Sequence, residues 1–299
     1  MALSTTNIDV YRGTEGVSLP KQLSSQIMQN AVESSAIMRL ANRIDLPGSG
    51  LTIPVITGDP RAAWVNETNE KAVSEPGLSS KNMTGYKIAV IVPFSNEFKR
   101  DMKSLYGAIV DRMPAAIAKK FDDTVFHGAA PGSNFDTLAS AAKVGLDAAN
   151  NGEWAALVAA DTAIATAGGE LDGWAMSPQG RAALIGAVDD NGRPLFVNST
   201  AEGAVSYILG AGVERSRAAY KTGTPSNIVG YAGDWTKAWY GTVEDIKIKV
   251  AEEATINDGT NIINLWQRNM FAVMAEVEVG FVIQDDDFFV ALTDGSESL

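Results

Sequence analysis

The chain has 299 residues, which is enough for one large domain or two ordinary ones with a sizeable core. Its 24 basic residues against 36 acidic ones give a formal net charge of -12, and this balance disfavours a groove that grips nucleic acid by neutralising phosphates. Zero cysteines exclude disulfides and thiolate sites, and no apolar run is long enough to span a bilayer.

The first predicted elements are an arm and two short helices. Residues 1–17 are polar and predict an extended arm. Pro20 suits the first turn of a helix, where its missing N–H costs nothing, and Ser35–Ala41 predicts a second helix. The breaker Pro47–Gly50 ends this helix, and Leu51–Val55 is predicted to be a strand.

The segment from Thr57 to Tyr86 is poor in apolar residues and rich in Gly, Pro, Asn, Ser and charge. A structureless loop of this length is uncommon inside a compact domain. We therefore predict an extended hairpin that gains its packing from other subunits. The chain returns as an alternating strand through Ile88, Val90 and Val92.

One very long helix is predicted next. Ser95 or Asn96 can cap it, and apolar residues then step by three or four along 97–127, a rod of roughly 46 Å. Pro114 lies inside this range and should kink the helix or interrupt one hydrogen bond. Gly128 supplies a stop.

The remainder mixes helices and strands and ends in a β-rich tail. The predicted helices are Asp136–Leu146, Trp154–Thr166 and one opened by Pro178. The predicted strands are Gly173–Met176, Ser206–Leu209, Ile228–Tyr231, Ala238–Val243, Asp245–Val250, Met270–Val282 and Phe288–Leu292. Glutamates alternate with valines in the Met270–Val282 strand, so one of its faces should be exposed to solvent.

Catalytic and metal-binding patterns are weak, and we assign no catalytic, cofactor-binding or metal-binding residue. His127 is the single histidine, and no Gly-x-Ser-x-Gly nucleophile elbow accompanies it. Asp285–Asp287 lacks the alternating ligands and central glycine of a calcium loop, which favours a solvated turn. The pair Asp122-Asp123 is interpreted as a solvated face. Paired carboxylates of a hydrolase stay an alternative, because such acids meet only in the fold.

The order of several motifs carries more information than any one of them. The motifs are Ala62-Ala63-Trp64-Val65-Asn66-Glu67, Ser95-x-Glu97, Met176-Ser177, Asp189–Leu195, Gly233-Asp234-Trp235 and Trp266–Met270. Together with the arm, the long loop and the long helix, this order resembles the major capsid protein of tailed double-stranded DNA bacteriophages, which has the Hong Kong 97-type shell fold. The resemblance covers nearly the whole chain.

The resemblance implies an α+β fold with an N-terminal arm, an extended loop, a peripheral domain with a long spine helix, and an axial domain. The first implied parts are the arm and helix at 1–48, the strand and extended loop at 49–94, and the spine helix at 95–132. The axial domain follows at 133–237, and the late sheet of the peripheral domain lies at 238–283 with its loop near 252–267. The last part is a C-terminal strand at 284–299, for which a return to the axial domain is one alternative.

The resemblance also implies a non-enzymatic shell subunit without cofactors. Copies would form pentamers and hexamers of an icosahedral head that encloses DNA without sequence-specific binding. Its implied partners are a portal and, as further alternatives, a separate scaffolding or decoration protein, with no membrane. The protein would belong to the virion and assemble in the bacterial host cytoplasm. The alternatives are an encapsulin-type compartment shell and, from another class, a carboxylate-dependent hydrolase.

Two groups of residues are expected to contact neighbouring subunits. The loop group is Trp64, Glu67, Glu70, Lys71, Glu75 and Lys81. The group of the spine and late loop is Lys99, Arg100 and Arg268. The chain starts with the arm, so no cleaved helical leader is expected. Some relatives join subunits through a loop Lys and an Asn, but no such crosslink is assigned here.

Overall fold

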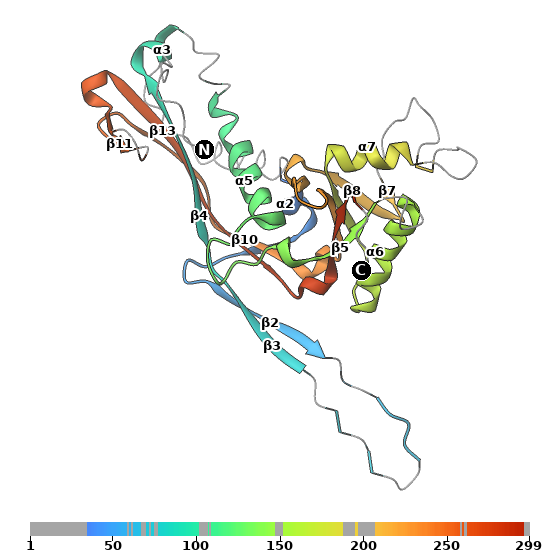
Figure 1. Cartoon of the computed structure of the whole chain (residues 1–299). Coiled ribbons are helices and arrows are strands. Elements are labelled where there is room, and N and C mark those ends of the chain that lie inside the picture. Colours follow the sequence, from blue (N-terminus) through green and yellow to red (C-terminus); the bar gives the residue numbers. More distant parts are fainter. Residues whose placement is uncertain are drawn as a thin grey trace.

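The computed structural model describes residues 35–58, 60, 62–66, 70–71, 73–74, 77–101, 107, 109–146, 152–187, 195–196, 207–257, 259 and 262–295. The predicted arm and first helix, residues 1–34, lie outside this part. Figure 1 shows an elongated molecule with two sheets and a long hairpin that projects away from both. The α+β class predicted from the sequence is confirmed.

A long four-stranded sheet forms one half of the body. Its order is β1 (Asn42–Asp45), β10 (Ala238–Ala251), β13 (Met270–Ile283) and β4 (Tyr86–Ser95). β10 runs parallel to β1 and antiparallel to β13, which in turn pairs antiparallel with β4. The two strands predicted between 238 and 250 are one strand, because irregular pairing between 242 and 247 bends β10 without ending it.

The predicted single spine helix is wrong. Helix α3 covers Asn96–Asp101, and the chain makes a turn at 111–112 before α5 begins at Met113 and runs to His127. Pro114 therefore occupies the first turn of α5, where its missing N–H and its ring are tolerated, and it does not sit inside a continuous rod. Gly128 ends α5 as predicted.

The second half of the body is a six-stranded sheet covered by two helices (Figure 1). The strand order is β5 (Ala142–Gly145), β14 (Phe289–Thr293), β9 (Ile228–Gly233), β6 (Gly173–Met176), β8 (Ala211–Arg215) and β7 (Tyr207–Ile208). The helices α6 (Glu153–Thr166) and α7 (Pro178–Gly186) pack against it through one apolar cluster. The strand prediction at Gly173–Met176 and the helix prediction at Trp154–Thr166 are confirmed.

The helix predicted at Asp136–Leu146 is wrong. This segment holds one 3-10 turn, η1 (Leu138–Ser140), and then β5, which pairs in parallel with β14. Local alanine content favours a helix, but the side chains of Val144 and Leu146 are buried in the cluster under the sheet. Tertiary packing therefore decides the conformation here.

The two sheets share one core. Aromatic side chains from α5, the four-stranded sheet and the six-stranded sheet meet in a single buried cluster. Phe121 lies edge-on to Phe281 at 6.3 Å between ring centroids, and Trp235 lies edge-on to Phe289 at 5.2 Å. Helix α2 (Ala36–Leu40), predicted from Ser35–Ala41, packs into the same cluster and is capped by the Ser35 hydroxyl.

The remaining described elements are short. They are β2 (Leu51–Gly58), β3 (Gly77–Met83), η3 (Arg217–Ala219), η4 (Trp235–Lys237), β11 (Thr255–Asn257), β12 (Ile262–Asn264), η5 (Trp266–Arg268) and η6 (Asp286–Phe288). None of the described helices has both the length and the apolar character needed to cross a membrane.

Candidate assembly surfaces

The projecting hairpin is built by β2 and β3. Leu51 pairs with Met83 at its base and Gly58 with Gly77 at the end of the ladder, so the described residues between 60 and 74 lie at the tip. At the rise of a strand, the ladder carries the tip roughly 20 Å beyond Met83. The predicted extended hairpin is confirmed in its described part, and its base is held by the burial of Met83.

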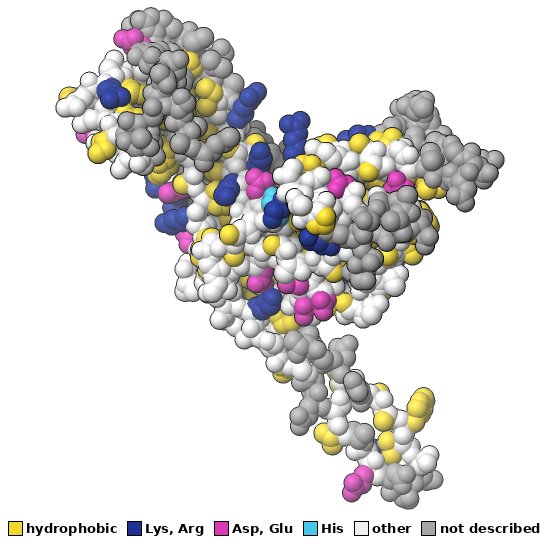
Figure 2. All heavy atoms as spheres, viewed as in Figure 1, with side chains coloured by type: hydrophobic (Ala, Val, Ile, Leu, Met, Phe, Trp, Pro, Cys, Tyr) yellow, Lys and Arg dark blue, Asp and Glu magenta, His cyan; other side chains and the backbone are white. Residues whose placement is uncertain are grey.

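Large apolar side chains lie exposed along this hairpin (Figure 2). Trp64 is fully exposed, and Val73 and Leu78 are 91% and 74% exposed. Singly exposed apolar residues are ordinary, but a group of them on a projection is typical of a protein–protein contact. The residues therefore form the first candidate assembly surface, which we call the hairpin surface: the described residues of 60–78.

The charged residues predicted for the loop have different surroundings. Glu70 and Lys71 are exposed on the hairpin surface, whereas Glu67 and Glu75 lie outside the described residues. Lys81 lies at the base, where its Nζ is 2.9 Å from Oδ2 of Asp136. The same Asp136 oxygen accepts a hydrogen bond from the backbone N–H of Ile283. Lys81 therefore ties the hairpin to the body of its own subunit.

A second candidate assembly surface lies at the end of the four-stranded sheet where β4 leads into α3. Asn96, which begins α3, donates hydrogen bonds from its backbone N–H and its side-chain amide to Asn269, each at 3.0 Å. This contact brings α3 beside η5, which carries the predicted residue Arg268. The backbone of α3 includes Lys99 and Arg100, whose side chains lie outside the described part.

Sequence reasoning missed two apolar residues at this second surface. Trp266 is 73% exposed and lies on η5 with Arg268, and Ile262 on β12 is 68% exposed. The available signal in the sequence was a tryptophan between the predicted late loop and the predicted strand Met270–Val282. Tryptophan and arginine are both enriched in interface hot spots.

Two basic side chains on the polar face of the four-stranded sheet are paired within the subunit. Lys249 Nζ donates to Glu276 at 2.6 Å, and Lys247 pairs with Glu244. The hydrogen bond from Lys249 lowers the pKa of Glu276, and the hydrogen bond to Glu244 raises the pKa of Lys247. These exposed pairs add little stability, but they neutralise cations that would otherwise attract phosphates.

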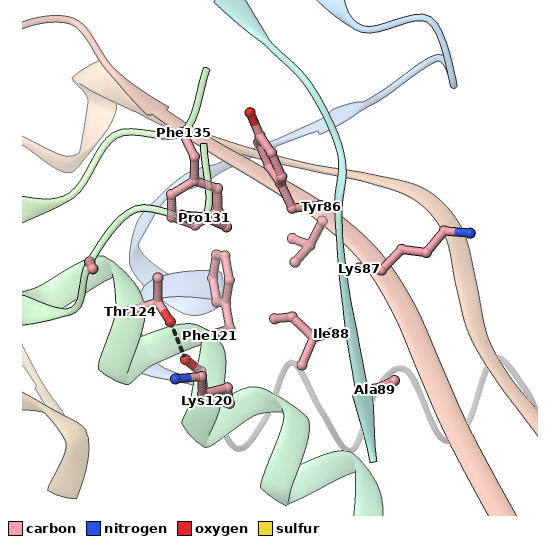
Figure 3. Close-up of a pocket in the computed structure, with 11 residues that line it drawn as sticks. Tyr86, Lys87, Ile88, Ala89, Lys120, Phe121, Thr124, Pro131 and Phe135 are labelled. Carbon is pink, nitrogen blue, oxygen red and sulfur yellow. Dashed lines mark hydrogen bonds between the residues drawn. The ribbon is translucent and has the colours of Figure 1, made fainter. Parts of the chain in front are cut away.

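A cavity of about 370 Å³ lies between β4 and α5 (Figure 3). Its walls are mostly apolar, with Ile88 from the strand facing Phe121 from the helix and Phe135 above them. The Thr124 hydroxyl at the edge donates to the Lys120 carbonyl at 2.8 Å. The lining contains neither a carboxylate nor an imidazole, and its titratable side chains are those of Tyr86, Lys87 and Lys120.

No group of described residues has the composition of a metal site. Burial lowers the pKa of His127, and its backbone carbonyl accepts a hydrogen bond from Lys221. The prediction that Asp122 lies on a solvated face is wrong, because its side chain is buried at 1% exposure.

The sequence was also compared with known proteins. It matches the description "Phage capsid family" over residues 15–294. It is 32% identical over 295 residues to "Probable major capsid protein gp17" of Mycobacterium phage L5, a match that covers 93% of this chain and 90% of that protein. It is 23% identical over 302 residues to "Major capsid protein" of Staphylococcus phage 80alpha, covering 96% of this chain and 87% of that protein.

Solved structures agree with the observed architecture. A chain from Mycobacterium phage Adephagia superposes with a TM-score of 0.74 at 20% identity, covering 89% of this chain and 91% of that chain. The capsid of an empty GTA particle superposes with a TM-score of 0.62 at 13% identity, covering 95% and 93%. At these identities the superpositions show a shared fold and nothing finer.

Proposed function

Since the chain belongs to the phage capsid family and is a structural subunit of a phage head shell, we propose that its hairpin surface is the main contact to a neighbouring copy. Subunits of this family form capsomers. We further propose that these capsomers are pentamers and hexamers, that they close an icosahedral head around double-stranded DNA, and that assembly takes place in the bacterial host cytoplasm.

The observation that carries the proposal is the exposure of Trp64 on a projection. A fully exposed indole gains free energy when a partner covers it, at roughly 25 cal/mol per Å² of apolar surface. A hairpin that reaches well beyond its own core cannot bury this side chain against that core. Closed symmetry gives every copy a neighbour, so one contact is repeated around the whole ring.

The two halves of the body fit the two domains that the resemblance implies. We propose that the four-stranded sheet with α5 is the peripheral domain and that the six-stranded sheet is the axial domain. In this arrangement β14 brings the C-terminal part of the chain into the axial domain, where it lies between β5 and β9. A portal, and a scaffolding or decoration protein, are proposed partners of the assembled subunits.

Absence of enzymatic activity is part of the same proposal. The capsid role named for the relatives supports it. The encapsulin-type shell and the carboxylate-dependent hydrolase receive no support from those relatives.

Replacing Trp64 with alanine should raise the concentration needed for shell assembly at least about tenfold, the effect expected of a lost interface hot spot. The melting temperature of the unassembled subunit should stay unchanged, because Trp64 is fully exposed within its own chain. Sedimentation and electron microscopy of shells, with calorimetry of subunits, measure the two effects. Trp64→Phe keeps an aromatic side chain and should restore most assembly; equal assembly by wild type and Trp64→Ala would refute the proposal.

The unassembled subunit should not retain duplex DNA at physiological salt, because its net charge is -12 and Lys247 and Lys249 are paired with glutamates. Fluorescence anisotropy with a labelled duplex across a salt series tests this. The double variant Glu244→Gln/Glu276→Gln frees both lysines and should bind more strongly at low salt. Tight, salt-sensitive binding by the wild-type subunit would contradict the prediction.

A further inference from the structure

A buried carboxylate joins three separate parts of the chain. Asp122 lies in α5, and its Oδ1 accepts a hydrogen bond of 2.5 Å from the Ser35 hydroxyl. Its Oδ2 accepts from the backbone N–H of Ala36 at 2.9 Å and from the Ser216 hydroxyl at 3.1 Å. We call these residues, Ser35, Ala36, Asp122 and Ser216, the Asp122 junction.

Each serine of the junction also caps a short helix. The Ser35 hydroxyl accepts from the Met38 N–H at the start of α2, and the Ser216 hydroxyl accepts from the Ala218 N–H at the start of η3. A single carboxylate therefore fixes the start of α2 and the start of η3 against α5. Loss of the carboxylate would leave buried hydroxyl and amide donors without their acceptor.

Burial raises the pKa of Asp122 from its usual 3.8 to about 6, against the opposing effect of the hydrogen bonds from Ser35, Ala36 and Ser216. The Asp122 side chain is only 1% exposed, so the surrounding protein disfavours its charged form and favours proton uptake.

The charged residues on the surrounding elements are Arg39 on α2, Glu214 and Arg215 on β8, Arg217 on η3, and Lys119, Lys120, Asp123 and His127 on α5. Arg39 also forms an ion pair with Glu214 at 2.7 Å, and this pair holds α2 to β8. Burial lowers the pKa of His127, so its titration has the opposite effect on stability: it destabilises the fold as pH falls.

We propose that Asp122 is a positioning residue that docks α2 onto α5 and η3, and that proton uptake by this carboxylate strengthens the docking. In the shell subunit, the Asp122 junction then sets the position of α2 on the body. The docking itself is a property of the single subunit and does not depend on the proposed contact of the hairpin surface.

The direction of the pH effect on docking follows from the linkage between proton binding and the opening of α2. A carboxyl with a raised folded-state pKa stabilises the closed state fully below pH 3.8, and this contribution is lost as pH rises through about 6. When α2 opens, Asp122 regains water and its ordinary pKa, so opening becomes easier at higher pH. Between pH 5 and pH 7.5 the opening equilibrium constant should rise about tenfold.

Hydrogen exchange of the amides in residues 36–41 measures this opening on the unassembled full-length subunit. After division by the intrinsic exchange rate at each pH, the wild-type constant should rise about tenfold between pH 5 and 7.5. Asp122→Asn keeps the shape of the side chain but does not titrate, so its constant should stay flat or fall.

Ser216→Ala keeps the carboxylate and removes one of its donors. Because the Ser216 hydroxyl lowers the pKa of Asp122, the rise in this variant should shift to higher pH. Three results would each overturn the proposal. The wild-type opening constant could stay flat across this pH range, Asp122→Asn could show the same rise, or the Ser216→Ala profile could superpose on that of wild type. If Asp122→Asn fails to fold, the comparison of Ser216→Ala with wild type decides. Shell formation is not used as a readout, so a failed Trp64→Ala test would leave this result unaffected.

Discussion

A subunit without the tip of its hairpin should fold normally and form no shells. The design replaces residues 57–77 with Asn-Gly, which joins the cross-strand partners Ile56 and Leu78 through a two-residue turn suited to a hairpin. This excision removes the fully exposed Trp64 and keeps the buried side chains of Ile53 and Val55. Assembly should be lost because the proposed contact to the neighbour is removed from every subunit at once.

Electron microscopy and sedimentation should show no shells when the variant is produced with the other head proteins of the phage, under conditions in which wild type assembles. Circular dichroism and melting of the unassembled variant should match wild type. A wider deletion that includes Met83 serves as the contrast, since Met83 is fully buried and its loss should destabilise the subunit itself. Shells of normal size from the excised variant would show that the tip is dispensable.

Phe281→Ala should lower the free energy of unfolding by about 3–5 kcal/mol, the usual cost of removing a buried aromatic ring. Phe281 is fully buried on β13, and its ring lies 6.3 Å from that of Phe121 and 6.2 Å from that of Phe135. These rings belong to the cluster that joins the two sheets, so the cavity left behind would lie between both halves of the body.

Chemical denaturation of the unassembled subunit measures the loss. Trp266→Ala is the matched control, because this aromatic is 73% exposed and its removal should change stability by less than about 0.5 kcal/mol. A loss below about 1 kcal/mol for Phe281→Ala would contradict a shared core between the two sheets.

The hairpin could be predicted because its composition is so different from that of a buried segment. Sparse apolar residues between Thr57 and Tyr86 excluded a core position, and the length excluded a plain loop. Helix α6 and strand β6 were also predictable, since both are marked by local pattern.

Other features depend on contacts that a local pattern does not contain. Strand β5 forms because β14, almost 150 residues later in the sequence, supplies its partner. The residues around Asp122 give no local sign that Ser35 and Ser216 will surround this carboxylate, so the sequence alone favoured solvent. The turn before Met113 is a different case, because Pro114 was noticed but its effect on the helix was underestimated.

The position of β14 has a consequence for the order of events during synthesis. This strand lies inside the six-stranded sheet, between β5 and β9, yet it is made after both of them. A nascent chain that has not reached Phe289 leaves β5 without a partner strand and exposes the edge of β9 that is not paired with β6. Long-range pairing of this kind is slow, and exposed edges invite aggregation. Ribosome stalling or premature termination before this point should therefore yield chains that are degraded or aggregate, and only translation past β14 supplies the head with usable subunits.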